Sequence, residues 1–326
     1  MVNEDKLYDL HMACVRKSCV ALNTVLNDVI SDRSISLKLN QLAYRLDGSS
    51  KNECGDLEPG SVKNALHLVS ATRSSLNLLS ESRQFNEEGE GIADEIRKTL
   101  DTIENSFGQY TRQKIRSLIH GLYVIIDPQI TGGREPLHIA QETLKGGATI
   151  LQLRDKIRDK GESLALARSI KRLCDDRGAL FIVNDHPDIA SVVQANGVHL
   201  GQGDLPISTA REVLSSTQIV GRSNHFLEEA IESEGQGADY IAVGAMYSTL
   251  SKNQPIVGGL RLLRQVKESV QPPVVAIGGI TQQHMEDVVR AGADAVCVIS
   301  LVGLAQNPKE ITHELVESIK FAGGKA

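Results

Sequence analysis

The amino-acid sequence predicts an α/β protein, a (β/α)8 TIM barrel preceded by a small all-α domain. Two observations carry this prediction. Only 6 of the 28 glycines lie before Gly121, and proline is almost absent there, so the composition changes within residues 108–121. After this change, short apolar runs alternate with amphipathic stretches at a period of about 25 residues, as in repeated strand–helix units. We therefore expect a helical accessory domain in residues 1–115 and a barrel domain in residues 116–326.

The first part of the chain is expected to form helices. Apolar residues recur at helical spacing in 7–29 and 36–46, and two longer helices are expected at about 62–84 and 92–119. The polar segment 47–61 separates the two pairs, and the acidic run "NEEGEG" separates the last two helices. No cluster of His, Cys or carboxylates in this part has catalytic or ligand spacing, so we expect a helical bundle or a pair of helical hairpins.

The second part contains eight apolar runs that we expect to be strands. They are "LYVIID" (122–127), "TILQLR" (149–154), "LFIVND" (180–185), "GVHLG" (197–201), "QIVGRS" (218–223), "DYIAVG" (239–244), "PVVAIG" (273–278) and "AVCVIS" (295–300). Their Ile, Val and Ala content suits a barrel interior filled by branched aliphatic side chains. A doubly wound open sheet is the alternative, but "DPQITGG" after the first strand lacks the G-x-G-x-x-G spacing that this fold would need.

Composition argues against several classes of function. The net charge of −6 argues against nucleic acid as the main partner. The five cysteines are scattered without a C-x-x-C pair, so neither a disulfide framework nor a zinc site is expected, and a reducing cytosol fits best. No segment approaches the ~20 apolar residues that span a bilayer. We expect a cytoplasmic protein that acts on small molecules.

Polar residues follow most of the predicted strands. In a TIM barrel the carboxyl ends of the strands and the loops after them form the active-site face, so residues at that height converge on one mouth. They are Gln152, Arg154, Lys156, Asn184, Asp185, His199, Asp204, Ser223, His225, Thr249, Ser251, Lys252, Gly278, Gly279 and Ser300. The predicted mouth is therefore rich in cations and hydroxyl groups and holds two separated acids.

Several of these residues suit phosphate binding. Gly278 and Gly279 precede a predicted helix whose free N–H groups hold phosphate once glycine lets the backbone approach, although a glycine pair is equally typical of a simple turn. Arg154, Lys156 and Lys252 offer cations to further phosphate oxygens. For any one of these cations, a surface ion pair explains the residue equally well.

The acids and histidines also have two interpretations each. Asp185 and Asp204 are oxygen ligands of the type that hold Mg²⁺ with water and a substrate diphosphate, or each caps the helix that follows it. His199 and His225 are interpreted as packed histidines at strand ends in preference to catalytic bases. The joint position of the polar residues favours the functional interpretation.

Seven segments carry a family resemblance. In order and spacing, thiamin-phosphate synthase (thiamin-phosphate pyrophosphorylase) resembles this chain at "LQLRDK", "VNDHPDIA", "ANGVHLGQGDLP", "VGRSNH", "DYIAVGAMYSTLSK", "VVAIGGIT" and "CVISLV", which together cover roughly 121–310. The resemblance implies a Mg²⁺-dependent transferase. Hydroxymethylpyrimidine diphosphate would lose pyrophosphate, and the ring nitrogen of a thiazole phosphate would attack the resulting methylene cation to give thiamin phosphate.

The resemblance also implies roles for the matching residues. Those at the pyrimidine diphosphate would be Gln152, Leu153, Arg154, Asp155, Lys156, Asn184, Ser223 and Lys252. Those at the thiazole phosphate would be Thr249, Ser251, Gly279, Ile299 and Ser300. Arg154, Lys156, Ser223 and Lys252 would be catalytic, and Asp185 and Asp204 would hold Mg²⁺.

Three positions depart from the family pattern. Ser248 replaces a proline and Ser251 replaces a threonine, so the hydroxyl is kept while loop rigidity is in question. Arg222 stands where a small or apolar residue is usual, and the sequence does not tell which way it points.

The alternatives to a synthase are a relative of the thiazole tautomerase type and a non-catalytic phosphate-binding regulator. A tautomerase would be expected to lack some of the residues that bind the diphosphate, whereas all of these residues are present here. The sequence does not decide the role of the N-terminal helices, which could be a scaffold, a dimerisation element in a homo-oligomer, or a ligand-binding module.

Overall fold

The computed structural model describes residues 4–29, 33–47, 62–81, 87–248 and 257–326. The chain divides into two compact units, Met1–Thr111 and Arg112–Ala326, and the division falls within a helix. Across these residues, no helix combines the length and the apolar character needed to cross a bilayer.

The first unit is helical, as predicted. Its helices are α1 (Glu4–Val29), α2 (Arg33–Asp47), α3 (Val62–Glu81) and the larger part of α4 (Glu87–Arg116). The helix α1 packs against both α2 and α3. Leucine and isoleucine at helical spacing, such as Leu22, Leu39, Leu76 and Ile96, are fully buried in one core. This unit therefore has an apolar core of its own.

The boundary between α3 and α4 differs from the expectation. The acidic run was expected to separate the two helices, but α4 begins inside it, at Glu87. Glu87, Glu88 and Glu90 lie in the first turn of α4, where carboxylates interact favourably with the positive end of the helix dipole. An acidic run thus begins this helix.

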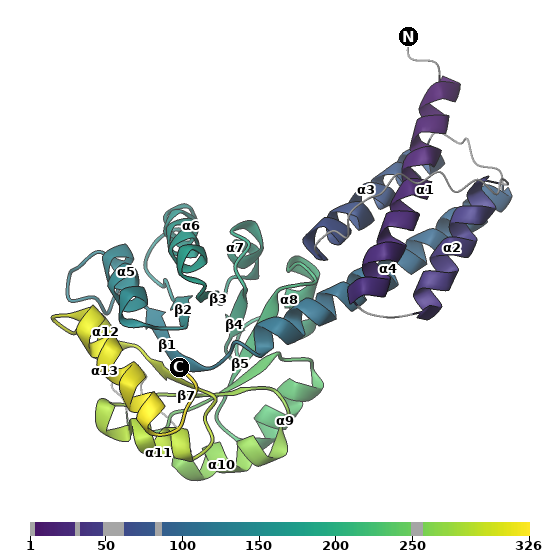
Figure 1. Ribbon diagram of the computed structural model, residues 1–326. Coiled ribbons are helices and arrows are strands. Elements are labelled where there is room, and N and C mark those ends of the chain that lie inside the picture. Colours follow the sequence, from purple (N-terminus) through teal and green to yellow (C-terminus); the bar gives the residue numbers. More distant parts are fainter. Residues whose placement is uncertain (1–3, 30–32, 48–61, 82–86, 249–256) are drawn as a thin grey trace. The chain divides into compact units, whose positions relative to one another are not determined.

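The second unit is a closed barrel of eight parallel strands (Figure 1), and the predicted fold is confirmed. The strands are β1 (Gly121–Ile126), β2 (Ile150–Leu153), β3 (Leu180–Asn184), β4 (Gly197–Leu200), β5 (Ile219–Asn224), β6 (Tyr240–Val243), β7 (Val274–Ile277) and β8 (Ala295–Val298). The pairing of β1 with β8 closes the sheet, which excludes the open-sheet alternative.

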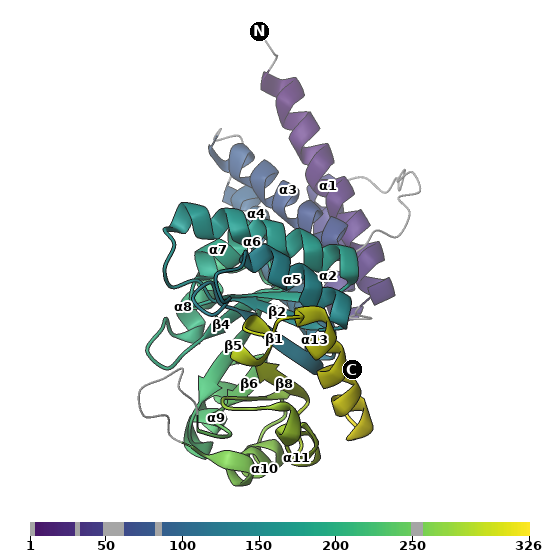
Figure 2. The ribbon, with the colours of Figure 1, turned by 90° about the vertical axis from the view of Figure 1, so that its left-hand side faces the viewer.

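Helices surround the barrel. They are α5 (Pro136–Gly146), α6 (Lys160–Arg177), α7 (Pro187–Val192), α8 (Ile207–Val213), α9 (Leu227–Gly235), α10 (Gly259–Ser269), η1 (Gln282–His284), α11 (Met285–Arg290), α12 (Ser300–Gly303) and α13 (Pro308–Phe321). The last helix, α13, packs against α5 and completes the ring (Figure 2). Left-handed glycines, Gly147 and Gly178, end α5 and α6 and turn the chain into the next strand.

Strand residues alternate between two apolar layers. In β2, Ile150 belongs to the cluster inside the barrel, whereas Leu151 and Leu153 pack in the layer between the sheet and the helices. This alternation follows from the two-residue period of a strand. It also decides which polar residues face the interior, because Gln152 shares the inward face with Ile150.

The segment before β1 covers the base of the barrel. Ile119 is buried in the interior cluster, and Ile115 packs against it. The Arg112 guanidinium donates to the carbonyl of Ser216 and lies 3.7 Å from a carboxylate oxygen of Asp239. Residues 112–119 therefore belong structurally to the barrel unit.

Candidate active site

The mouth is built at the carboxyl ends of the strands, as the fold predicts. Asn184 at the end of β3 lies opposite His199 of β4 in the sheet register. Ser223 is near the end of β5, and its Oγ lies 2.8 Å from Nε2 of His199. Residues from three consecutive strands thus meet at one end of the barrel.

The first cation of the mouth has a buried partner. Arg154, directly after β2, forms an ion pair with Asp127, which follows β1 and whose side chain is fully buried. The carboxylate of Asp127 also accepts from the backbone N–H of Gln129 at 2.9 Å. Asp127 was not among the expected site residues, although a polar residue directly after "LYVII" was the signal used at the other strands.

Lys156 and the two acids form a second group. The Lys156 ammonium forms an ion pair with Asp185, and Asp185 has a left-handed backbone (φ 61°) that is uncommon outside glycine. Burial, and then hydrogen bonding to the neighbouring Asp185 carboxyl, raise the pKa of Asp204. The two carboxyl groups predicted as metal ligands therefore lie side by side.

This pair fits a magnesium ion. Mg²⁺ in proteins is usually bound through one or two carboxylates together with water and substrate phosphates, and a cation stabilises two carboxylates that lie close together. Within the described ranges, no group of three or more His, Cys, Asp or Glu residues is placed to hold a metal. The two aspartates would then supply only part of the coordination shell.

The loop that carries Asp204 is held at several points. Asp204 Oδ2 accepts from the backbone N–H of Gly201 at 2.7 Å. The Arg222 guanidinium donates to the carbonyls of Leu205 at 3.0 Å and Gln202 at 3.4 Å, one on each side of Asp204. The Gln202 side chain donates to the carbonyl of Ser223 at 2.7 Å.

The direction of Arg222 follows from strand alternation. Its neighbour Ser223 points into the barrel, so Arg222 points outward, into the layer between the sheet and the helices. There it is only 7% exposed. Arg222 therefore faces the loop that carries Asp204, to which it is hydrogen-bonded, and does not face the barrel interior.

Two residues of the expected substrate-binding set, Leu153 and Asp155, are held by contacts within the protein. Leu153 packs in the outer apolar layer. The Asp155 carboxylate accepts from the backbone N–H groups of Ile157 and Arg158 and forms an ion pair with the Arg158 guanidinium at 3.3 Å. These contacts organise the loop after β2.

Both histidines are held by hydrogen bonds. Both ring nitrogens of His199 make hydrogen bonds, to Tyr240 and to Ser223. His225 Nδ1 lies 2.6 Å from the carbonyl oxygen of Gly244, and the His225 N–H donates to Glu229.

The other side of the mouth follows β7 and β8. Gly278 and Gly279 both have left-handed backbones, and a Cβ on Gly279 would lie 2.6 Å from the carbonyl oxygens of Tyr247 and Ser248. Ile299 precedes α12, and Ser300 is its exposed first residue. Thr249, Ser251 and Lys252 lie outside the described residues.

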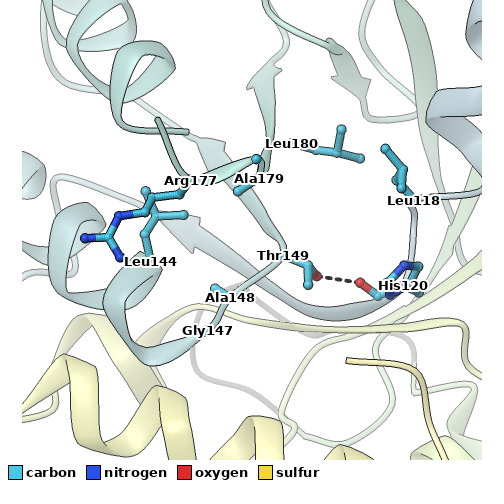
Figure 3. Close-up of a pocket in the computed structure, with 10 residues that line it drawn as sticks. Leu118, His120, Leu144, Gly147, Ala148, Thr149, Arg177, Ala179 and Leu180 are labelled. Atoms are coloured by element: carbon cyan, nitrogen blue, oxygen red, sulfur yellow. Dashed lines mark hydrogen bonds between the residues drawn. The ribbon is translucent and has the colours of Figure 1, made fainter. Parts of the chain in front are cut away.

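A separate cavity of about 300 Å³ lies at the opposite end of the barrel (Figure 3). It is lined by residues that precede the first strands or end helices, among them His120, Thr149 and Arg177, and Thr149 Oγ1 donates to the His120 carbonyl at 2.5 Å. None of the residues expected to carry chemistry lines it.

Comparisons with known proteins match the barrel unit. The model of the thiamine monophosphate synthase family matches residues 122–302. The thiamine-phosphate synthase of Shouchella clausii is 43% identical over 204 residues, covering 62% of this chain and 97% of that protein. That of Methanospirillum hungatei is 48% identical over 184 residues, covering 56% of this chain and 89% of that protein.

A solved structure shows the same similarity. The thiamine phosphate pyrophosphorylase from Pyrococcus furiosus is 37% identical to this chain and has a TM-score of 0.60. The match covers 64% of this chain and 100% of that protein. The helices α1 to α4 precede the residues that the family model matches.

Proposed function

Because the chain belongs to the thiamine monophosphate synthase family, whose members are transferases, we propose that it joins hydroxymethylpyrimidine diphosphate to thiazole phosphate. The C–O bond between the methylene carbon and the diphosphate breaks, and its electron pair leaves with pyrophosphate. The thiazole ring nitrogen then bonds to the same carbon, giving thiamin phosphate. No residue of the chain is required as a nucleophile.

The observation that carries the proposal is the grouping of cations and acids at the mouth. Arg154 and Lys156 follow one strand, and each pairs with an aspartate that follows a neighbouring strand. Breaking the C–O bond builds negative charge on the leaving group, and fixed cations stabilise charge where it develops. Asp127 holds the Arg154 guanidinium in place, so that it need not reorganise during the reaction.

Asp185 and Asp204 are the residues that would hold Mg²⁺. When bound, the ion would neutralise charge on the diphosphate oxygens. Lys156 pairs with Asp185 in the structure and would turn to the diphosphate once a cation satisfies the carboxylate. This exchange of partners is consistent with the 44% exposure of the Lys156 side chain.

The two substrates would occupy different parts of the mouth. Gln152, Asn184 and Ser223, on β2, β3 and β5, would bind the pyrimidine. Gly279, Ile299 and Ser300, after β7 and β8, would bind the thiazole phosphate, with Thr249 and Ser251 from the loop after β6 and Lys252 reaching the diphosphate. The helical unit would be accessory, since every residue proposed for chemistry belongs to the barrel unit. We place the reaction in the cytoplasm.

The proposal is tested by incubating the purified full chain with both substrates and Mg²⁺ and following thiamin phosphate and pyrophosphate. Equal amounts of the two products are expected, and none when either substrate is omitted. Isomerisation of the thiazole phosphate alone would identify a tautomerase. Binding of both ligands without product would identify a regulator.

A further inference from the structure

The loop between β1 and α5, residues 127–135, connects two parts of the mouth that lie on different strands. We call it the β1 loop. It begins at Asp127, whose fully buried side chain pairs with Arg154 after β2. Near its end is Arg134, whose guanidinium contacts the segment after β8. In the sheet, β1 pairs with β2 on one side and with β8 on the other. The β1 loop therefore lies between the Arg154 side of the mouth and the side that holds α12.

Arg134 joins the β1 loop to the carboxyl end of α12. Its Nη1 donates to the carbonyl of Ala305 at 2.7 Å, and its Nη2 donates to the carbonyl of Gly303 at 2.7 Å. Its Nε donates to the carbonyl of Thr131, within the β1 loop itself, at 3.0 Å. A guanidinium presents its donors in one rigid plane, so the three carbonyls are held in a fixed arrangement.

The backbone of the β1 loop is shaped to bring Arg134 to this position. The two glycines at 132–133 have left-handed backbones, with φ of 60° and 80°, which residues with a Cβ rarely adopt. Directly after them, the Arg134 N–H donates to the Thr131 carbonyl at 3.3 Å. At the start of the loop, the Ile130 N–H donates to the Asp127 carbonyl at 2.8 Å. Two hydrogen-bonded turns thus determine the course of the loop.

The helix α12 depends on contacts of this kind for its place. It has only four residues, Ser300–Gly303, and a single helical turn is not stable by itself in water. The last carbonyls of a helix have no partner within the helix, so a cation beside them satisfies them and interacts favourably with the helix dipole. Arg134 supplies that cation.

The β1 loop and α12 also pack closely. A Cβ on Gly303 would lie 2.3 Å from the carbonyl oxygen of Ile130, so only glycine allows the two backbones to approach this far. Val302, the neighbour of Gly303, is buried in the apolar layer between the sheet and the helices. The helix is therefore fixed by the β1 loop and by the core together.

We propose that Arg134 is a positioning residue, which fixes the carboxyl end of α12 to the β1 loop and thereby sets the place of Ile299 and Ser300 at the mouth. The inference rests on our proposed function, which puts these two residues at the thiazole phosphate. Arg134 acts through α12 and not by touching a substrate. Its effect is confined to the phosphate side of the mouth, because Asp127, at the other end of the loop, is held by its own buried ion pair.

The first test is steady-state kinetics of the full chain with Mg²⁺. Arg134→Met keeps the length and the apolar stem of the side chain but removes its donors. The KM for the thiazole phosphate is expected to rise about tenfold or more, while the KM for the pyrimidine diphosphate stays within about twofold. Arg134→Lys keeps one charged donor and should recover part of the loss. An unchanged KM for the thiazole phosphate, or an equal rise in both KM values, would overturn the proposal.

Arg211→Met is the matched control. Arg211 also donates to backbone carbonyls of neighbouring segments, those of Gln218 at 2.6 Å and Gly237 at 3.1 Å, and it pairs with Asp239. These segments precede β5 and β6, so they lie at the opposite end of the barrel. The variant is expected to melt at a lower temperature but to keep the wild-type ratio of the two KM values. A change in this ratio as large as in Arg134→Met would mean that the ratio reports a general loss of stability, and the positioning role would be refuted.

Gly303→Ala tests the same contact from the side of α12. Its Cβ would meet the Ile130 carbonyl, so α12 has to move away from the β1 loop. The same selective rise in the KM for the thiazole phosphate is expected, which keeps the test decisive if Arg134→Met does not fold. A folded Gly303→Ala variant with wild-type KM values would count against the proposal as strongly as an unaffected Arg134→Met.

The second test follows α12 directly and needs no reaction. The backbone N–H groups of residues 302–305 make the hydrogen bonds of α12 and of the turn that ends it. Their hydrogen exchange is expected to be faster in Arg134→Met than in the wild type, whereas exchange in β5 should be unchanged. Unchanged exchange in residues 302–305 would show that Arg134 does not hold α12, and the inference would fall.

Failure of this inference can be told apart from failure of the proposed function. A wild-type protein that forms thiamin phosphate, with no selective change of KM in Arg134→Met, would refute the positioning role alone. A wild-type protein that forms no product would refute the synthase function, and faster exchange in residues 302–305 of Arg134→Met would still show that Arg134 holds α12.

Discussion

The guanidinium of Arg154 and the carboxylate of Asp127 form an ion pair in which the acid is fully buried. The first prediction concerns this pair. In Asp127→Asn the Gln129 N–H keeps an oxygen acceptor, but Arg154 loses the charge that orients it. We expect kcat/KM for the pyrimidine diphosphate to fall about 10- to 100-fold, the size of a charge-assisted hydrogen bond. Steady-state kinetics checks this, and Asp188→Asn, at an exposed ion pair, should stay near wild type.

The second prediction concerns Lys156. Lys156→Ala removes a cation from the proposed leaving-group site, and turnover is expected to fall about 10- to 100-fold. Lys160→Ala is the matched control, because Lys160 also pairs with an aspartate, Asp188, but its side chain is 67% exposed. Single-turnover measurement of pyrophosphate release compares the two. Equal rates in both variants would remove Lys156 from the mechanism.

The third prediction concerns the carboxyl of Asp204, whose pKa is raised by burial and then by its hydrogen bond to Asp185. Its pKa is raised, so the folded protein holds this proton more tightly than the unfolded chain does. The carboxyl therefore reduces stability as the pH rises through its folded pKa. At neutral pH, metal-free Asp204→Asn is expected to melt at a higher temperature than the wild type. It should also lose the rise in melting temperature that Mg²⁺ gives the wild type.

Thermal melting with and without Mg²⁺ checks this expectation. Asp176→Asn, at an exposed position on α6, should melt and respond to Mg²⁺ as the wild type does. A full Mg²⁺ response in Asp204→Asn would contradict the assignment of Asp204 as a ligand.

The fourth prediction concerns Arg222. Arg222→Ala leaves the carbonyls of Gln202 and Leu205 without their donor, so hydrogen exchange in residues 201–206 should become faster. Because this loop carries Asp204, a higher Mg²⁺ concentration should also be needed for activity. Arg222→Lys keeps one donor and should restore part of the protection. Arg168→Ala, exposed on α6, should leave this exchange unchanged. Unchanged exchange in Arg222→Ala would mean that other contacts hold the loop.

The fifth prediction concerns the helical unit. A fragment of residues 109–326 keeps Arg112 and Ile115 and is expected to fold and to retain the synthase reaction. A fragment of residues 117–326 lacks both and should melt at a lower temperature, because the base of the barrel loses an ion pair and apolar packing. Product formation and melting temperature check the two fragments. A folded but inactive longer fragment would show that the helical unit contributes to catalysis.

Much of the fold could be predicted from local sequence patterns. Strand runs, glycine-rich turns and the change in composition each depend on residues close in the chain, and the structure confirms the barrel that they indicate. The beginning of α4 was misjudged, because the acidic residues around Glu88 are typical of a loop and also of the first turn of a helix.

The interior contacts of the site could not be predicted in the same way. Tyr123 and Tyr240 are 117 positions apart, and their hydroxyl groups meet only because the sheet closes. Arg222 and Ser223 are both polar, so the sequence alone does not tell which one faces inward. Asp127 could have been predicted as a site residue, since it directly follows a strand as the other site residues do.

The interior cluster has a consequence for the order of events in a catalytic cycle. Tyr123, Tyr240 and Ile182 fill the barrel below the mouth, and Ile119 covers its base. Among the described residues these side chains close the barrel below its mouth, so under our proposed function both substrates would arrive, and both products depart, by the mouth. Whichever molecule lies deeper has to be loaded first and released last, and each product obstructs the arrival of the next substrate.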